Sequence, residues 1–576
     1  MIDKIRLGSV KNQYTPKQKG QGHSKQQPGF KGIVDGFIAG VQMCEKHPMV
    51  NVSVLDLSTA IVPRTIIETC TGSKKKDENG NTKRELNFYG GFEAFRREGS
   101  GLIINCLIPS FIVMGAAKLL QKPIMGKIGH NSNLTNVWAN SDTIDKVKDF
   151  YEKADGANKE QKVYNTLKNM ISSIEGVDGN AEKGGMKKFN NMYSLLDGSV
   201  HKLTKIICAD KFDSKAANKA YQDIVSKTHI SENIKFEGDN KFFANSLESL
   251  TVDGSKLLHN LVKENISDTK GLEKYFSKAK TLVTAKSLAG LGVIIPLAIA
   301  AQPINRWITR KMSGRKGAPI YSDFNDRKED QELTPKQKAQ LLKQKFISVG
   351  SMIGVAALSM IMDKPSKNLL QFKGLFPSMD QARIISTATF ASRMAASEDR
   401  NELREATIRD IATFSSFYFL GDYAAKGIAT AIEKHDPNAR LLNRMKEAPK
   451  DANVLQKFWN WAKHTSIKST DELATVKDKK LRTICQIGNL AFSLLSLGVF
   501  IPLYTRTQTN KKRQQELAKL NEKQASNAVK TQTAPASYAA KTAGAAGVSD
   551  SSSVLADDFS KTLVKDNTAF KAFFNS

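Results

Sequence analysis

Apolar runs separated by strongly polar stretches dominate this 576-residue chain. A helix needs about 17–25 residues to cross the hydrocarbon core of a bilayer, and four runs reach that length. They cover residues 101–121, 287–305, 346–362 and 483–505. A chain with one water-soluble core would instead spread its apolar residues as amphipathic stripes along its helices. The pattern therefore predicts an all-α fold, built as a multi-pass helical membrane bundle.

Weaker apolar elements accompany these runs and are broken by charges or by proline. They cover residues 32–43, 54–69, 381–397 and 411–432. The sequence leaves open whether they also cross the bilayer or lie at its surface. The predicted number of crossings therefore ranges from four to eight.

An internal repeat organises the apolar runs. SLAGLGVIIPL at 287–297 returns as SLLSLGVFIPL at 493–503, with eight of eleven positions identical. Three further correspondences precede it in the same order in both halves. They pair Arg97 and Glu98 with Arg404 and Glu405, Arg64 with Arg393, and more faintly 37–46 with 352–364. We therefore predict a two-fold duplication with halves at about 31–310 and 345–515.

Composition divides the chain into segments of different character. The Lys- and Glu-rich stretch 127–275, with helical periodicity, predicts a soluble helical domain inserted into the first half. The predicted segments are a disordered basic tail (1–30), the N-terminal part of the first repeat (31–126), the inserted domain (127–275), the last spanning helix of that repeat (276–310), a basic cytoplasmic linker (311–344), the second repeat (345–515), and a polar linker with a terminal amphipathic helix (516–576).

The strong positive charge changes the expected partner. Lys and Arg number 86 against 57 Asp and Glu, a net charge of +29. Nucleic acid is the first partner this suggests, but the basic residues are dispersed and form no recognisable nucleic-acid-binding motif. Basic residues flanking apolar runs favour anionic lipid headgroups instead. The basic exits at 306–316 and 511–513 predict that both termini are cytoplasmic, with 127–275 and 363–482 on the opposite side.

Ionisable residues inside apolar elements are the best candidates for function, because charge is costly in lipid. The candidate intramembrane charges are Arg64, Arg97, Glu98, Arg393, Arg404, Glu405 and Asp422. They predict either an intramembrane charge network or a binding site for an anionic group, or else ordinary pairing and anchoring at helix ends, which we favour. Lys426, one turn after Asp422, is its expected partner.

Prolines within the apolar runs predict helix kinks at Pro109, Pro296 and Pro502. In the repeated motif they would free the carbonyl groups of Gly292 and Gly498, four residues earlier. Packing and bending is the favoured interpretation, and a cavity lined by those carbonyls is the alternative.

Motifs for chemistry are absent from the sequence. The histidines and five scattered cysteines show no metal-ligand spacing, and phosphate-binding and nucleophile motifs are lacking. We therefore predict no metal, no cofactor and no enzymatic activity. The leading function is a membrane scaffold or transporter-like bundle. The alternatives are a soluble or peripheral all-α interaction protein, and a membrane-bound enzyme using the duplicated Arg and Glu residues. The terminal helix, with Phe559 and Phe574, is a possible protein-docking element.

Overall fold

The computed structural model describes residues 33–46, 48–70, 74–76, 82–84, 86–129, 133–177, 185–266, 268–313, 334–362, 368–374, 376–398, 400–446, 449 and 451–501, and the isolated residues 504, 507, 508 and 511. The predicted basic tail and the terminal amphipathic helix lie outside these residues, as does Pro502.

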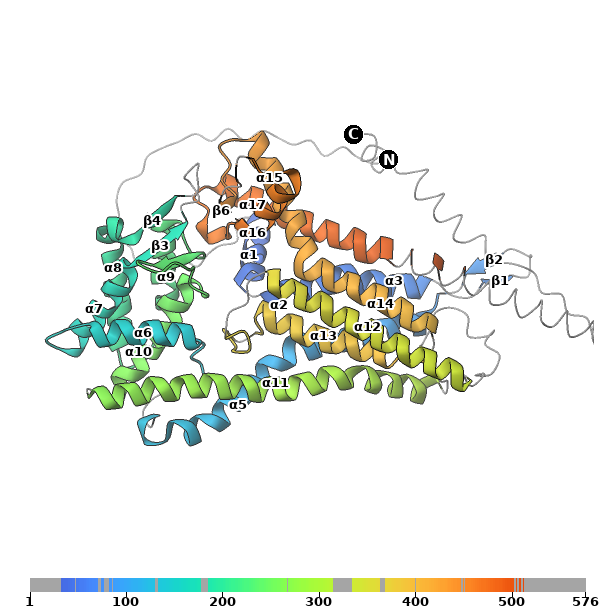
Figure 1. Ribbon diagram of the computed structural model, residues 1–576, viewed down its shortest axis with the longest axis horizontal. Helices are drawn as coiled ribbons and strands as arrows, with labels where there is room; N and C mark the ends of the chain where they lie inside the picture. The colour runs from blue at the N-terminus through green and yellow to red at the C-terminus, as the bar shows by residue number, and fades with distance from the viewer. Residues whose placement is uncertain are drawn as a thin grey trace, which may run out of the picture.

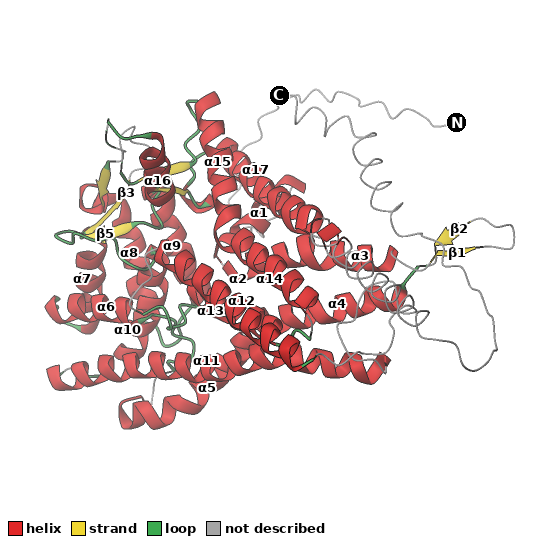
Figure 2. Cartoon of the chain, turned by 45° about the vertical axis from the view of Figure 1, so that its right-hand side comes forward, coloured by secondary structure: helices red, strands yellow, loops and turns green. Residues whose placement is uncertain are grey.

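The described chain is predominantly helical, which confirms the all-α prediction (Figure 2). The elements before the inserted domain are α1 (Ile33–Lys46), α2 (Pro48–Leu55), the π-helical segment η1 (Asp56–Ile61), α3 (Val62–Cys70), the strands β1 (Lys74–Lys76) and β2 (Thr82–Arg84), α4 (Phe88–Leu102), the π-helical η2 (Ile103–Leu107) and α5 (Ile108–Met125). Those after it are α11 (Thr269–Ser313), α12 (Pro335–Met362), α13 (Met379–Ala395), α14 (Arg400–Ser415), the π-helical η6 (Ser416–Leu420), α15 (Gly421–His435), β6 (Leu442–Arg444), α16 (Val454–His464), β7 (Thr465–Ile467), the short 3-10 helix η7 (Thr470–Glu472), α17 (Val476–Ser493) and the π-helical η8 (Leu494–Phe500).

The inserted region forms a domain with its own apolar core. Its elements are η3 (Gly126–Gly129), α6 (Ser141–Lys153), α7 (Lys159–Ser172), β3 (Ile174–Val177), β4 (Met186–Lys188), η4 (Phe189–Met192), α8 (Tyr193–Cys208), α9 (Ser214–Thr228), β5 (Ile234–Phe236), η5 (Ser249–Asp253) and α10 (Gly254–Lys263). Its largest core cluster runs from Met125 to Val283, so the end of α5 and the start of α11 belong to it.

Five helices of the described chain are long and apolar enough to cross a membrane. They are Met49–Cys70, Phe88–Ile128, Thr269–Met312, Pro335–Ile361 and Val476–Phe500. The four predicted runs fall on four of them. The fifth coincides with the weaker element at 54–69. The weaker elements at 381–397 and 411–432 are helical but are not among the five.

The bundle and the inserted domain lie side by side along α11 (Figure 1). The first half of α11 contributes Tyr275 and Leu282 to the domain core. Its second half contributes Leu291 and Ile294 to a core shared with α5 and α13. One helix therefore belongs to both bodies.

Short antiparallel sheets are the feature that periodicity missed. The domain contains the three-stranded sheet β4–β3–β5, in which Glu175 lies opposite Lys188 and Lys235. β6 pairs with β7, and β1 with β2. These strands have three or four residues each. That is too short for alternation of apolar and polar residues to be recognisable.

The predicted kinks take two different forms. η1 and η2 end two residues before Pro63 and Pro109, and η8 ends two residues before Pro502. A π-helical segment shifts the hydrogen-bond pattern by one residue, so it absorbs the bond that a proline cannot donate. Around Pro296, in contrast, α11 continues as one α-helix. The two copies of the repeated motif therefore differ in backbone form.

The glycines of the repeat also differ in their surroundings. A Cβ atom on Gly498 would lie 3.1 Å from the carbonyl oxygen of Thr59, whereas one on Gly292 would meet nothing within 4 Å. In the first copy the close approach is at Gly290, where a Cβ would lie 2.5 Å from Val113 Cγ2. Gly350 and Gly354 of α12 have the GxxxG spacing that permits close helix packing, but a Cβ atom on either would meet nothing within 4 Å.

Candidate functional site

Three of the candidate charges meet at one point between helices. Arg64 on α3 donates to Glu98 on α4 at 2.6 Å, and Arg393 on α13 approaches the other carboxylate oxygen of Glu98 at 3.3 Å. Arg393 also pairs with Asp410 on α14 at 2.9 Å. Arg64 and Arg393 are the two arginines matched by the internal repeat. They hold one carboxylate between them.

A second set of polar contacts joins α11 to the same helices. Arg96 on α4 donates to Asn305 and Thr309 on α11, at 2.9 Å each. Arg306, on the next position of α11, forms an ion pair with Glu402 on α14. The contacts therefore close a circle from α4 to α11, α14, α13 and back to α4. We call this set of residues the polar ring; it consists of Arg64, Arg96, Glu98, Asn305, Arg306, Thr309, Arg393, Glu402 and Asp410.

The polar ring lies at the end of the bundle remote from the inserted domain. Arg306 is near the end of α11, and Arg393 is near the end of α13. Asp410 is the most buried member, with 1% of its side chain exposed. Its Oδ1 atom accepts from Arg393 and Arg409, whereas Oδ2 has no hydrogen-bond partner. Charged side chains in an apolar bundle are tolerated when they are paired with opposite charges, and the charged side chains of the ring are paired in this way.

The remaining candidate charges lie outside the ring or at its edge. Arg97 adds a positive charge close to Glu98. Arg404 approaches Gln508 at 3.5 Å, and Glu405 is half-buried on the same helix. Asp422 pairs with Lys426 at 2.8 Å, as their spacing predicts.

Sequence reasoning missed several ring members. These members lie at or near the ends of the predicted apolar elements; they are Arg96, Asn305, Arg306, Glu402 and Asp410. Asn305 ends the apolar run 287–305, and Arg306 begins the basic segment that follows it. That pattern indicated anchoring of the helix end at the lipid surface. Their partners come from helices about one hundred to two hundred residues away, which no local pattern reveals.

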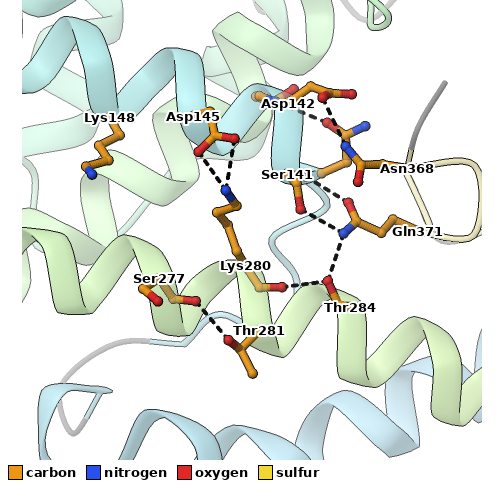
Figure 3. A network of polar contacts seen from close by, with 12 residues as sticks. Ser141, Asp142, Asp145, Lys148, Ser277, Lys280, Thr281, Thr284, Asn368 and Gln371 are labelled. Carbon is orange, nitrogen blue, oxygen red and sulfur yellow. Dashed lines mark hydrogen bonds and ion pairs between the residues drawn. The ribbon is translucent and has the colours of Figure 1, made fainter.

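A second polar site joins the inserted domain to the second half of the chain (Figure 3). The segment 368–374, between α12 and α13, lies against α6 and α11. The Gln371 side chain accepts from the Ser141 backbone N–H at 2.8 Å and donates to the Ser141 hydroxyl at 2.7 Å and to Thr284 at 2.8 Å. The backbone N–H of Phe372 donates to Ser287 at 3.0 Å. We call this segment the docking segment.

Glu472 of η7 makes another contact with the inserted domain. Its carboxylate accepts from the backbone N–H groups of Ser231 at 2.9 Å and Glu232 at 3.1 Å. Burial raises the pKa of Glu472 above its ordinary value, although these amide donors act in the opposite direction. The domain is thus held by both the docking segment and η7 of the second half.

An open cavity of about 560 Å³ lies beside the docking segment, between α6 and α11. Asp145 and Lys280, which line it, form an ion pair with Nζ–oxygen distances of 2.8 and 2.9 Å (Figure 3). Ser141 and Thr284, which hold Gln371, line the same cavity. Part of its lining therefore holds the domain to α11.

Within the part of the chain that the structure describes, no three His, Cys, Asp or Glu side chains gather as a metal site would require. The described cysteines are all free thiols. Comparisons with protein-family models, with curated proteins and with solved structures found no match to this chain.

Proposed function

We propose that this protein is an integral membrane scaffold, whose helical bundle crosses the bilayer and holds the inserted domain on one face. The observation that carries the proposal is α11, a helix of 45 residues shared by the two bodies. At 1.5 Å per residue it is about 67 Å long. That length accommodates a membrane crossing of about 30 Å as well as a full side of the domain.

Exposed apolar surface supports the membrane over the soluble alternative. In each of the five candidate spans, no more than 44% of the apolar window is buried. Large side chains such as Phe111, Leu119 and Phe346 are 72–77% exposed on these helices. A soluble bundle would bury such residues, because contiguous exposed apolar surface of this extent marks an interaction with lipid or protein.

The packing also supports two duplicated halves. α11 of the first half packs against α13 of the second, and η8 of the second half packs against η1 of the first. In the predicted duplication, α11 corresponds to α17–η8, and η1–α3 corresponds to α13. Each half therefore inserts its last helix against the second helix of the other, which is the reciprocal contact expected of a pseudo-two-fold arrangement.

The proposed topology follows from the order of the helices along the chain and from the side of the bundle on which each one ends. If α13 and α14–α15 cross together with the five longer helices, the passes alternate and number seven. The inserted domain then faces one side, and Cys70, Ser313 and Phe500 face the other. In this seven-pass arrangement, residues 33 and 500 would lie on opposite sides of the membrane, whereas the four-pass arrangement predicts both termini on the cytoplasmic side.

Alkaline carbonate extraction of native membranes tests the crossing. We expect the protein to stay in the membrane pellet, because the apolar windows are embedded in lipid. Release into the supernatant together with a peripheral control protein would contradict the proposal and favour the soluble alternative.

Rigidity tests the scaffold. Spin labels at Lys215→Cys in the domain and Ile353→Cys in the bundle occupy exposed positions. We expect one narrow distance distribution, because the docking segment and α11 fix the domain. Two resolved distances between the labels would contradict a rigid scaffold.

A transporter-like bundle is the second candidate, and the unpaired Oδ2 atom of Asp410 is the observation that favours it. A transported ion or proton would need such a free, buried acceptor. In that case Asp410→Asn would abolish flux in proteoliposomes while leaving the bundle folded. If the ring is structural, the same substitution lowers thermal stability.

A further inference from the structure

α16 presents large apolar side chains to its surroundings. Val454, Leu455, Phe458 and Trp459 are 86%, 73%, 51% and 45% exposed. Successive residues of a helix turn by about 100°, so these four share one arc of the surface. The helix begins with a capping box at Asn453 and is continued by β7, so its position is fixed at both ends.

The C-terminal part of the same helix packs on the protein. Ala462 is buried, and the indole N–H of Trp461 donates to the Thr430 hydroxyl of α15 at 3.2 Å. The Trp461 ring lies 6.2 Å from that of Tyr423. The exposed arc is therefore the part of the helix that projects beyond α15.

Contacts between α15 and α17 give the level of α16 along the bundle. A Cβ on Gly421 would lie 2.3 Å from Asn489, and one on Gly488 would lie 2.1 Å from Ile428. Those two contacts lie in the second half of α17. Ala429 and Ile432, which flank Thr430 on α15, share a core cluster with Leu481 of α17, so Thr430 lies nearer the start of α17. There the charged start of α17 ends at Arg482, and the uncharged run begins at Thr483. α16 lies where the bundle changes from polar to apolar.

The charge around the exposed arc is mainly positive. Exposed lysines lie on α16 itself at Lys457 and Lys463, and Lys446 is exposed in the segment that precedes the helix. The Lys463 ammonium lies 4.9 Å from the centre of the Trp459 ring. Tryptophan beside lysine, at the level where a span begins, is the composition that favours the headgroup region of a bilayer.

We propose that α16 lies in the interface of the bilayer, with its exposed apolar arc in the acyl chains and its lysines on anionic lipid headgroups. This inference rests on the proposed membrane location of the bundle. The apolar arc would then reach about 5–10 Å below the headgroup boundary. Docked in this way, α16 fixes the β6–β7 region, and through η7 the inserted domain, against the membrane surface.

Spin-label accessibility in the full-length protein tests the proposal. Cys44, Cys70 and Cys208 are replaced by Ser, and the buried Cys106 and Cys485 stay in place. Single labels are placed at Leu455→Cys and Phe458→Cys on the arc, at Lys457→Cys on the polar side of the same helix, and at Ile487→Cys on the exposed face of α17. The protein is reconstituted in nanodiscs of zwitterionic lipid, with and without anionic lipid.

We expect the ratio of collisions with oxygen to collisions with a water-soluble nickel complex to be several-fold higher at Leu455 and Phe458 than at Lys457. The ratio should rise further with anionic lipid. Aqueous values at Leu455 and Phe458, with a lipid value at Ile487, would overturn the docking of α16 alone. Shielding from both reagents would also overturn it, since a protein then covers the arc. An aqueous value at Ile487 would overturn the membrane location itself.

Discussion

Arg393→Ala tests whether the polar ring holds the bundle together. Arg393 bridges two acidic residues from different helices, Glu98 of α4 at 3.3 Å and Asp410 of α14 at 2.9 Å. The substitution removes both ion pairs at once. Glu98 then keeps Arg64, and the almost completely buried Asp410 keeps Arg409 at 3.2 Å. Neither carboxylate is left alone, but Asp410 loses one of its two arginine partners, and Glu98 loses one of the arginines around it.

The magnitude follows from that geometry. Breaking a buried ion pair by removing one partner costs about 3–5 kcal/mol. Because each acid retains one arginine, we expect the lower end, about 3 kcal/mol. That corresponds to roughly a 150-fold increase in the unfolded fraction at equilibrium.

Thermal unfolding in detergent micelles provides the assay. In a background with Cys44, Cys70 and Cys208 replaced by Ser, a thiol-reactive dye reports unfolding when it reaches Cys106 and Cys485, which are buried in the folded protein. Arg404→Ala is the matched control, because Arg404 is half-buried and only approaches Gln508 at 3.5 Å. Its expected cost is below about 1 kcal/mol. Equal losses for Arg393→Ala and Arg404→Ala would refute the reasoning that the ring is a structural clamp.

Three further predictions concern the inserted domain and the packing of α11. Gln371→Ala leaves the buried amide at the start of α6 without its acceptor, so we expect a cost of about 1–3 kcal/mol, seen as faster hydrogen exchange at that amide. Burial raises the pKa of Asp253 from 3.8 to about 6. The unfolded carboxyl therefore ionises first as pH rises, and domain stability should fall between about pH 4 and 6. Denaturant melts should show this fall disappearing in Asp253→Asn. Gly290→Ala should cost about 1–3 kcal/mol in thermal melts, because its methyl group has no room beside α5. Gly292→Ala, facing open space, is the control, and an equal loss there would contradict the packing.

Length and hydropathy predicted most of the fold, because a spanning helix is defined by its own sequence. The four runs fall on four of the five candidate helices, and the fifth contains the interruption at Pro63 and Arg64 that weakened its signal. The helices α13 and α14–α15 gave weaker patterns, since charged residues such as Arg393 and Asp410 lie within them. Those charges are satisfied by distant helices, which periodicity does not record.

The candidate site was only partly predictable for the same reason. The repeat singled out Arg64, Glu98 and Arg393, because duplicated charges in apolar elements stand out in one sequence. It also singled out Arg404 and Glu405, which lie outside the ring among the described residues. Asp410 had no repeated counterpart, and Arg306 stood out only as part of a basic exit. Similarly, Gln371 lies in a connection without periodicity, and its importance depends on α6 and α11 meeting there.

Labelling of native cysteines from the two sides of the membrane tests the central claim most directly. Cys70 ends α3 at the end of the bundle remote from the inserted domain, and Cys208 ends α8 within that domain. Single-cysteine variants in sealed vesicles of both orientations are treated with a membrane-impermeant maleimide. We expect Cys70 and Cys208 to be labelled from opposite sides. Labelling of both from the same side would contradict a bundle that crosses the bilayer and holds the inserted domain on one face.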